Sequence, residues 1–165
     1  MASTAHLASH RQTLYFASLH CQHLAEGGPT IAEPLQHRQC LLEAATECLY
    51  RSSVFLVNHL LEQSAAPTVP TIAGSQAFAN WLAEAHSTAH QDPALARLAS
   101  AFSAPNPLAD LPGAYAALWS PATATHRPAD HLRLVDTTVS LERCVEWHDL
   151  LEGLAAECIA MQSEY

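Results

Sequence analysis

Apolar residues recur at every third or fourth position along three long segments of the chain, and no long stretch alternates between apolar and polar residues. Spacing of three and four places apolar side chains on one face of a helix, whereas alternation is typical of a strand. Breaks that contain proline and glycine, "GGP" at 27–29 and "SAAPTVPTIAGS" at 64–75, interrupt the pattern. The sequence therefore predicts an all-α protein without a sheet.

We expect three long helices and three shorter ones. The long helices are expected at residues 5–25, 30–63 and 136–165. The shorter helices are expected at residues 76–90, 93–103 and 110–119. Asp92 is placed to cap the helix that opens at Pro93, because its carboxylate can accept the free N–H groups of the first turn. Helices of this length must bury their apolar faces on one another, which predicts one irregular helix bundle, a single domain over residues 1–165.

Helical spacing also predicts which side of the second long helix faces the core. Leu49 and Leu56 lie on the apolar arc, whereas Glu47, Arg51 and Asn58 lie on the opposite side. Glu47 and Arg51 are four residues apart, a spacing that favours an ion pair on a helix surface. We therefore expect the side that carries these three polar residues to face solvent.

The charge of the chain argues against two classes of partner. Sixteen acidic and seven basic residues give a net charge of −9, and the basic residues, all arginine, are scattered singly. Nucleic-acid binding needs basic residues gathered in a patch, and an acidic surface is repelled by anionic membranes. The longest apolar run, "VFLV" at 54–57, is too short to span a bilayer. We expect neither a nucleic acid nor a membrane as partner.

The first residues and the cysteines indicate the compartment. The opening stretch "MASTAHLASHRQ" has neither the basic start nor the apolar run of a secretory signal. The five cysteines are odd in number, lack CxxC spacing and fall among apolar residues of predicted helices. These features predict reduced thiols and a cytoplasmic location.

Eleven histidines, four of them in "HLASHRQTLYFASLHCQH" at 6–23, raise the question of a metal site. Helix geometry separates Cys21 from His23 by about 160°, so this stretch cannot supply a complete ligand set by itself. His59 and His148 fall on apolar faces of two long helices and are expected to point inward. If those helices are neighbours, a transition metal such as zinc could be held by His59, His148, His20 and His10. We favour the simpler interpretation, in which each histidine forms an ordinary hydrogen bond and no cofactor is bound, and we keep the metal site as the alternative.

Sequence motifs of other enzyme classes are present only in part. Arg143 and His148 in "RCVEWH" match the Arg-x(4–6)-His element of the helical HEPN-type RNases, although an acidic surface suits RNA poorly. The chain has neither a glycine-rich phosphate loop nor a G-x-S-x-G nucleophile elbow. No assembled catalytic set is visible in the sequence.

Three segments of the chain also resemble a bacterial family of helical proteins of unknown function. They are "QTLYFASL" in the first helix, "DPALARL" after the tryptophan helix, and "ERCVEWHDLLEGL" in the last helix. The likeness spans most of the chain. The resemblance implies an all-helical fold and a bacterial protein, and it implies no activity.

The leading functional hypothesis is a non-enzymatic cytoplasmic helical domain that binds another protein or itself. Aromatic residues of the short helices are the candidate contact residues: Trp81, Phe102, Tyr115 and Trp119. The competing hypothesis is a metal-binding enzyme or sensor that uses the inward histidines. An RNase of the HEPN type is a third alternative.

Overall fold

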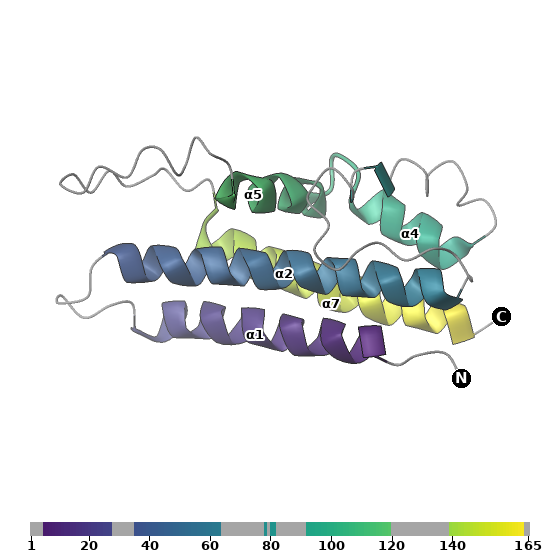
Figure 1. Ribbon diagram of the computed structural model, residues 1–165, viewed down its shortest axis with the longest axis horizontal. Helices are drawn as coiled ribbons and strands as arrows, with labels where there is room; N and C mark the ends of the chain where they lie inside the picture. The colour runs from purple at the N-terminus through teal and green to yellow at the C-terminus, as the bar shows by residue number, and fades with distance from the viewer. Residues whose placement is uncertain are drawn as a thin grey trace.

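In the computed structural model, the chain forms a bundle of α-helices (Figure 1). The structure describes residues 5–27, 35–63, 78, 80–81, 92–119 and 139–163. The α-helices in these ranges are α1 (Ala5–Gly27), α2 (Leu35–Gln63), α4 (Pro93–Ala101), α5 (Leu111–Leu118) and α7 (Leu141–Ser163). A 3-10 helix, η2 (Pro107–Asp110), precedes α5. No residue in the described ranges belongs to a strand, so the all-α prediction is confirmed.

The three long helices pack against one another, and α2 lies at the centre. Figure 1 shows α1 along one side of α2, the short helices α4 and α5 along the other, and α7 behind. Helix α1 runs opposite to α2 and α7. Within the described ranges, no helix is long and apolar enough to cross a membrane.

The central position of α2 buries it on almost every side. Between residues 52 and 61, only Phe55 keeps partial exposure. Asn58, which the sequence placed on a solvent-facing side, is only 1% exposed, because α4, α5 and α7 cover the side of α2 that α1 leaves free. Glu47 and Arg51 lie nearer the start of α2, and they form the expected ion pair.

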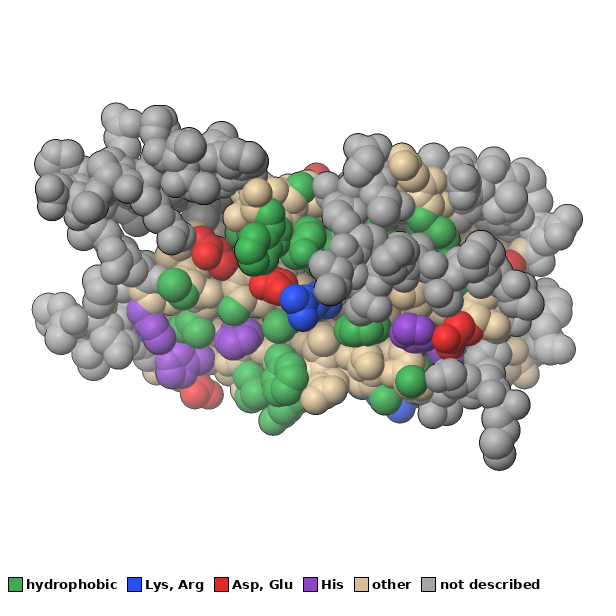
Figure 2. All heavy atoms as spheres, viewed as in Figure 1, with side chains coloured by type: hydrophobic (Ala, Val, Ile, Leu, Met, Phe, Trp, Pro, Cys, Tyr) green, Lys and Arg blue, Asp and Glu red, His purple; other side chains and the backbone are tan. Residues whose placement is uncertain are grey.

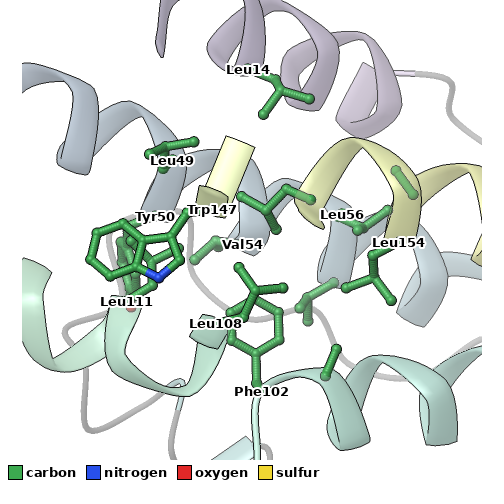
Figure 3. Close-up of a cluster of buried hydrophobic side chains, with 14 of the residues drawn as sticks. Leu14, Leu49, Tyr50, Val54, Leu56, Phe102, Leu108, Leu111, Trp147 and Leu154 are labelled. Atoms are coloured by element: carbon green, nitrogen blue, oxygen red, sulfur yellow. The ribbon is translucent and has the colours of Figure 1, made fainter. Parts of the chain in front are cut away.

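The core combines side chains from all of these helices (Figure 3). The Trp147 ring of α7 belongs to the same buried cluster as Tyr50 of α2 and Leu111 of α5. Its indole Nε1 donates to the Pro107 carbonyl oxygen at 2.8 Å, so the polar end of the ring is satisfied within the core. Burial of one large apolar side chain stabilises a fold by about 1.5–3 kcal/mol, so this cluster holds the short helices onto the long ones.

One observed helix start agrees with the sequence prediction and another differs from it. Asp92 caps α4 as predicted, and its Oδ1 accepts the N–H groups of Ala94 and Leu95 at 2.9 and 3.3 Å. Helix α7 begins at Leu141, later than predicted, because Ser140 is its cap: the Ser140 Oγ accepts the Arg143 N–H at 3.2 Å. Residues 136–138 of the predicted helix lie outside the described residues. The predicted start of the second helix at 30–34 and most of the predicted helix at 76–90 lie outside the described residues.

Candidate functional site

Three large apolar side chains are exposed together on α1. Tyr15, Phe16 and Leu19 have exposed fractions of 59%, 43% and 39%. Tyr15 and Leu19 lie one helical turn apart on the same side of α1, and Phe16 lies next to them. Figure 2 shows hydrophobic side chains projecting from the middle of α1, at the lower edge of the view. We call these three residues the α1 patch.

The local sequence explains why the patch cannot be buried. Four apolar residues follow one another in "LYFA" at 14–17, and a helix turns by about 100° per residue, so they point in different directions. Leu14 and Ala17 face the other helices, with exposed fractions of 7% and 0%. The two aromatic residues between them must therefore point outward. The patch was not predicted from the sequence, although this unbroken apolar run was a signal that could have located it.

Helix α1 is almost free of charge around the patch. Arg11 and Glu26 are its only arginine and acidic residue, and both are exposed on the side that carries the patch. Neither takes part in an ion pair with another residue that the structure describes. With neutral histidines, α1 therefore has no net charge, whereas the whole chain carries −9.

A second polar feature joins the start of α1 to the end of α2. His6 Nε2 lies 3.1 Å from Glu62 Oε1, and Figure 2 shows histidine and acidic side chains together where these two helix ends meet. One turn further along α1, His10 Nδ1 donates to the Ser52 carbonyl oxygen at 3.0 Å. The Ser52 Oγ donates in return to the His10 carbonyl oxygen at 3.2 Å. These bonds fix the register of α1 against α2.

His59 lies in the same region, and one of its ring nitrogens is buried without a hydrogen-bond partner among the described residues. Its exposed fraction is 7%, and its Nδ1 makes no hydrogen bond; the buried Oε2 of Glu62, one turn later, also makes none. Burial lowers the pKa of His59 and also that of His10, whose backbone hydrogen bond to Ser52 opposes the effect. Because burial penalises the charged form, both imidazoles are neutral at pH 7.

The four histidines proposed as metal ligands are not gathered at one point. His10 and His59 are buried, whereas His20 and His148 are half-buried. His148, which was expected to point inward, has its Nδ1 3.1 Å from the Asp149 Oδ1. Among the residues that the structure describes, no set of three or more histidine, cysteine, aspartate or glutamate side chains is placed to hold a metal ion. The metal hypothesis therefore gains no support from these four residues.

The four aromatic residues proposed for partner binding have different surroundings. Phe102 is a core residue with an exposed fraction of 5%. The Tyr115 ring stacks on buried Tyr50 with 3.9 Å between the ring centroids, and Trp81 is half-buried against the core. Trp119, at the end of α5, is 64% exposed. Three of the four therefore contribute to packing, and Trp119 alone presents most of its surface to solvent.

The arginine of the RNase-like element is occupied by acidic neighbours. The Arg143 guanidinium binds the carboxylate of Glu146 at 2.7 Å and also that of Asp110, and it lies 5.7 Å from the centre of the Trp147 ring. The hydrogen bond to Glu146 raises the pKa of Arg143, and the bond to Asp110 adds to this effect. A guanidinium covered by two carboxylates is poorly placed to bind a phosphate, so the geometry offers nothing in favour of RNA cleavage.

Comparison with known proteins indicates no function for this chain. No family model, curated protein or solved structure matches the chain. The resemblance of its sequence to a bacterial helical family therefore stays an expectation. The described surface instead singles out α1, whose outer face is apolar at its centre and neutral overall.

Proposed function

We propose that this chain is a non-enzymatic helical domain that works by self-association, with the α1 patch as its contact surface. The observation that carries the proposal is the exposure of Tyr15, Phe16 and Leu19 side by side on one helix face. Contiguous apolar surface without charges between its members is typical of protein interaction sites. Covering it releases about 25 cal/mol for each Å² of apolar surface removed from water.

The charges that flank the patch favour a second copy of this chain as the occupant. Arg11 and Glu26 lie 15 residues apart on the exposed side of α1, a distance of about 22 Å along the helix. In an antiparallel pair of α1 helices with a two-fold axis that crosses the exposed face of the patch at the level of residue 17, the Arg11 side chain of each copy extends toward Glu26 of the other. A parallel pair would place like charges together. The two-fold arrangement is also the commonest symmetry of protein dimers.

The same axis gives the apolar side chains complementary positions. Tyr15 and Leu19 lie two residues on either side of Ala17, so Tyr15 of one copy faces Leu19 of the other. Phe16 lies at the edge of this contact and packs beside it. The neutral charge of α1 also matters, because two copies of a chain that carries −9 repel each other through their acidic faces.

The size of this face predicts a weak dimer. Helix α1 has 23 residues and is therefore about 34 Å long. One face of a single helix is smaller than the roughly 800 Å² that each partner buries in a stable complex of standard size. The association should therefore depend on concentration, with a dissociation constant of about 10 µM or weaker.

Sedimentation velocity of the full chain, from about 1 µM to about 1 mM, tests the proposal. We expect monomer at the low end and a growing dimer fraction at the high end. The double variant Tyr15→Ser/Leu19→Ser should remain monomeric throughout. A matched control is Val145→Ser/Leu150→Ser, which removes two apolar side chains of similar exposure, 41% and 39%, from the outer face of α7.

The control variant should dimerise like the wild-type chain. If the wild-type chain is monomeric at every concentration, self-association through α1 is wrong. The same conclusion follows if the α1 and α7 variants weaken the dimer equally, because the contact would then not be specific to the α1 patch. Circular dichroism of each variant at the lowest concentration verifies that the fold is retained.

A further inference from the structure

Two histidines from different helices meet where α1 ends and α2 begins. The ring centres of His23 and His37 are 5.8 Å apart, with an angle of 73° between the ring planes. His23 lies near the end of α1, and His37 lies in the first turn of α2. Figure 2 shows histidine side chains gathered at this end of the two helices, at the left of the view. Packing of α1 against α2 therefore brings two imidazoles together.

One ring nitrogen of this pair lacks a partner. His37 is half-buried, and its Nε2 is buried without a hydrogen bond to any residue that the structure describes. A buried polar atom that makes no hydrogen bond costs free energy, so native structures rarely leave one. His23 is exposed, and its ring is therefore free to rotate. A ligand that binds imidazole nitrogen at this point would remove the cost at His37.

The spacing of the two rings suits a metal ion. Zinc–nitrogen bonds of about 2.0–2.1 Å at a tetrahedral angle place two imidazole centres about 5 Å apart. The observed separation of 5.8 Å differs from this by less than a small rotation of the exposed His23 ring supplies. Neutral imidazole is the commonest protein ligand of metals and suits zinc, copper and nickel. One ion can therefore bind both rings with little change in the helices.

The surroundings of the pair define an open site with two protein ligands. Among the described residues, no three histidine, cysteine or carboxylate side chains are grouped to hold an ion, so water would complete the coordination. Glu26 on α1 and Arg38 on α2 are the charged residues nearest to the pair in sequence, and their charges offset each other. The net charge of −9 on the whole chain attracts cations.

We propose that His23 and His37 bind one divalent transition metal ion, of the ligand preference of Zn²⁺, which links the end of α1 to the start of α2. Neither residue is among the four histidines that the sequence suggested as metal ligands. The ion is held within one chain, so the site does not depend on the proposed self-association. With two protein ligands instead of four, we expect a dissociation constant of about 1–100 µM.

Isothermal titration calorimetry of the full chain with zinc chloride tests the proposal. A Cys40→Ser background removes an exposed thiol that would otherwise bind zinc by itself. We expect one ion to bind per chain. Magnesium chloride should give no binding, because Mg²⁺ prefers oxygen ligands. The thermal midpoint should rise with zinc concentration, because an ion held between two helices binds the folded chain more tightly than the unfolded one.

Single substitutions in this background assign the ligands. His23→Gln and His37→Gln should each weaken zinc binding by at least about 10-fold. His20→Gln is the matched control, because it removes a histidine from the same helix one turn before His23, and it should bind zinc like the background chain. Circular dichroism verifies the fold of each variant. In the chain without any histidine substitution, the NMR ring signals of His23 and His37 should change first as zinc is added.

The double variant Tyr15→Ser/Leu19→Ser separates the metal site from self-association. It should bind zinc like the background chain, because both histidines remain in place. Three results would overturn the proposal: no zinc binding up to about 1 mM, one ion bound for every two chains, or a loss of affinity in His20→Gln as large as that in His37→Gln. Zinc binding that survives both His23→Gln and His37→Gln would place the ion elsewhere and would overturn it as well.

Discussion

Helices α1 and α7 both have 23 residues and both pack on α2, yet their outer faces differ. On α7, exposed Val145 and Leu150 stand on a helix that carries five carboxylates and one arginine. On α1, the three exposed side chains of the patch stand between a single arginine and a single glutamate. The neighbours of an exposed apolar residue therefore decide its role. A single apolar side chain among charged residues is an ordinary part of a hydrated surface, whereas adjoining apolar side chains without charges between them form a candidate contact surface.

The inner faces of the two helices differ as well. Helix α7 presents Trp147 and other apolar side chains to the core, where the ring is 1% exposed. Helix α1 presents Leu14 and Ala17, but it also buries His10, which binds the backbone of α2 at Ser52. The attachment of α1 therefore includes polar contacts that depend on protonation, whereas that of α7 is mostly apolar.

The largest effect should come from the inner face of α7. Trp147→Ala removes the largest fully buried side chain among the described residues and leaves the Pro107 carbonyl without its donor. We expect it to lower the free energy of unfolding by about 3–5 kcal/mol. Tyr15→Ala, on the outer face of α1, should change it by less than about 0.5 kcal/mol. Urea denaturation at low protein concentration measures both.

The result for Tyr15→Ala decides whether the α1 patch supports the fold of the monomer or is free for a second copy. A loss for Tyr15→Ala that approaches the loss for Trp147→Ala would mean that the tyrosine supports the fold of the monomer. The α1 patch would then be structural and not free for a second copy.

Acidification should loosen α1 before α7. Burial holds the folded-state pKa values of His10 and His59 below the ordinary 6.5, whereas the unfolded chain keeps the ordinary value. The unfolded chain therefore binds more protons in this window. The stability that the neutral histidines contribute is complete above about pH 6.5 and is lost as the pH falls toward the folded-state values. Hydrogen–deuterium exchange at about pH 7 and about pH 5 should show α1 amides losing protection first.

The neighbouring charges set the size of this effect, and a variant isolates it. Glu62 raises the pKa of His59 and so reduces the loss of stability on acidification, whereas Arg11 and His6 lower that pKa. His59→Leu removes one titrating group from the core and should make stability less dependent on pH. Equal loss of protection in α1 and α7, or earlier loss in α7, would contradict the expectation that the attachment of α1 is the more sensitive to acid.

The fold was predictable where it depends on local sequence. Asp92 before Pro93 located the start of α4, and apolar spacing located most of α1 and α2. Asn58 was misplaced because a helical wheel divides a helix into two sides, whereas a central helix is covered by several neighbours. The start of α7 was misplaced because Ser140, a good cap, was overlooked.

The candidate sites depended on contacts that the sequence does not encode locally. Whether His10 and His148 converge depends on helix rotation, and the structure buries His10 in the core and leaves His148 half-buried beside the exposed Asp149. The α1 patch was accessible in principle, because four consecutive apolar residues cannot all lie on one side of a helix.

The smallest effect concerns the charges at the ends of the patch, and it tests how the two α1 helices are oriented in the dimer. Arg11→Glu places two carboxylates at each end of an antiparallel pair, so we expect the dimer dissociation constant to rise about 3- to 10-fold at low salt. Arg11→Glu/Glu26→Arg restores opposite charges and should return the constant to about its original value. Glu157→Arg reverses a single exposed charge on α7, outside the α1 patch, and serves as a control, since its present contact is with Arg97 of α4.

Rescue by the double variant separates pairing from net charge. Arg11→Glu alone adds negative charge to a chain that already carries −9, and this would weaken any association of two copies. The double variant has the net charge of the original chain, and only an antiparallel pair also recovers two opposite contacts from it. In a parallel pair, residue 11 faces residue 11 and residue 26 faces residue 26, so like charges face each other before and after the exchange. Single variants that leave the dissociation constant unchanged would therefore reject the antiparallel arrangement while the patch itself remained the contact.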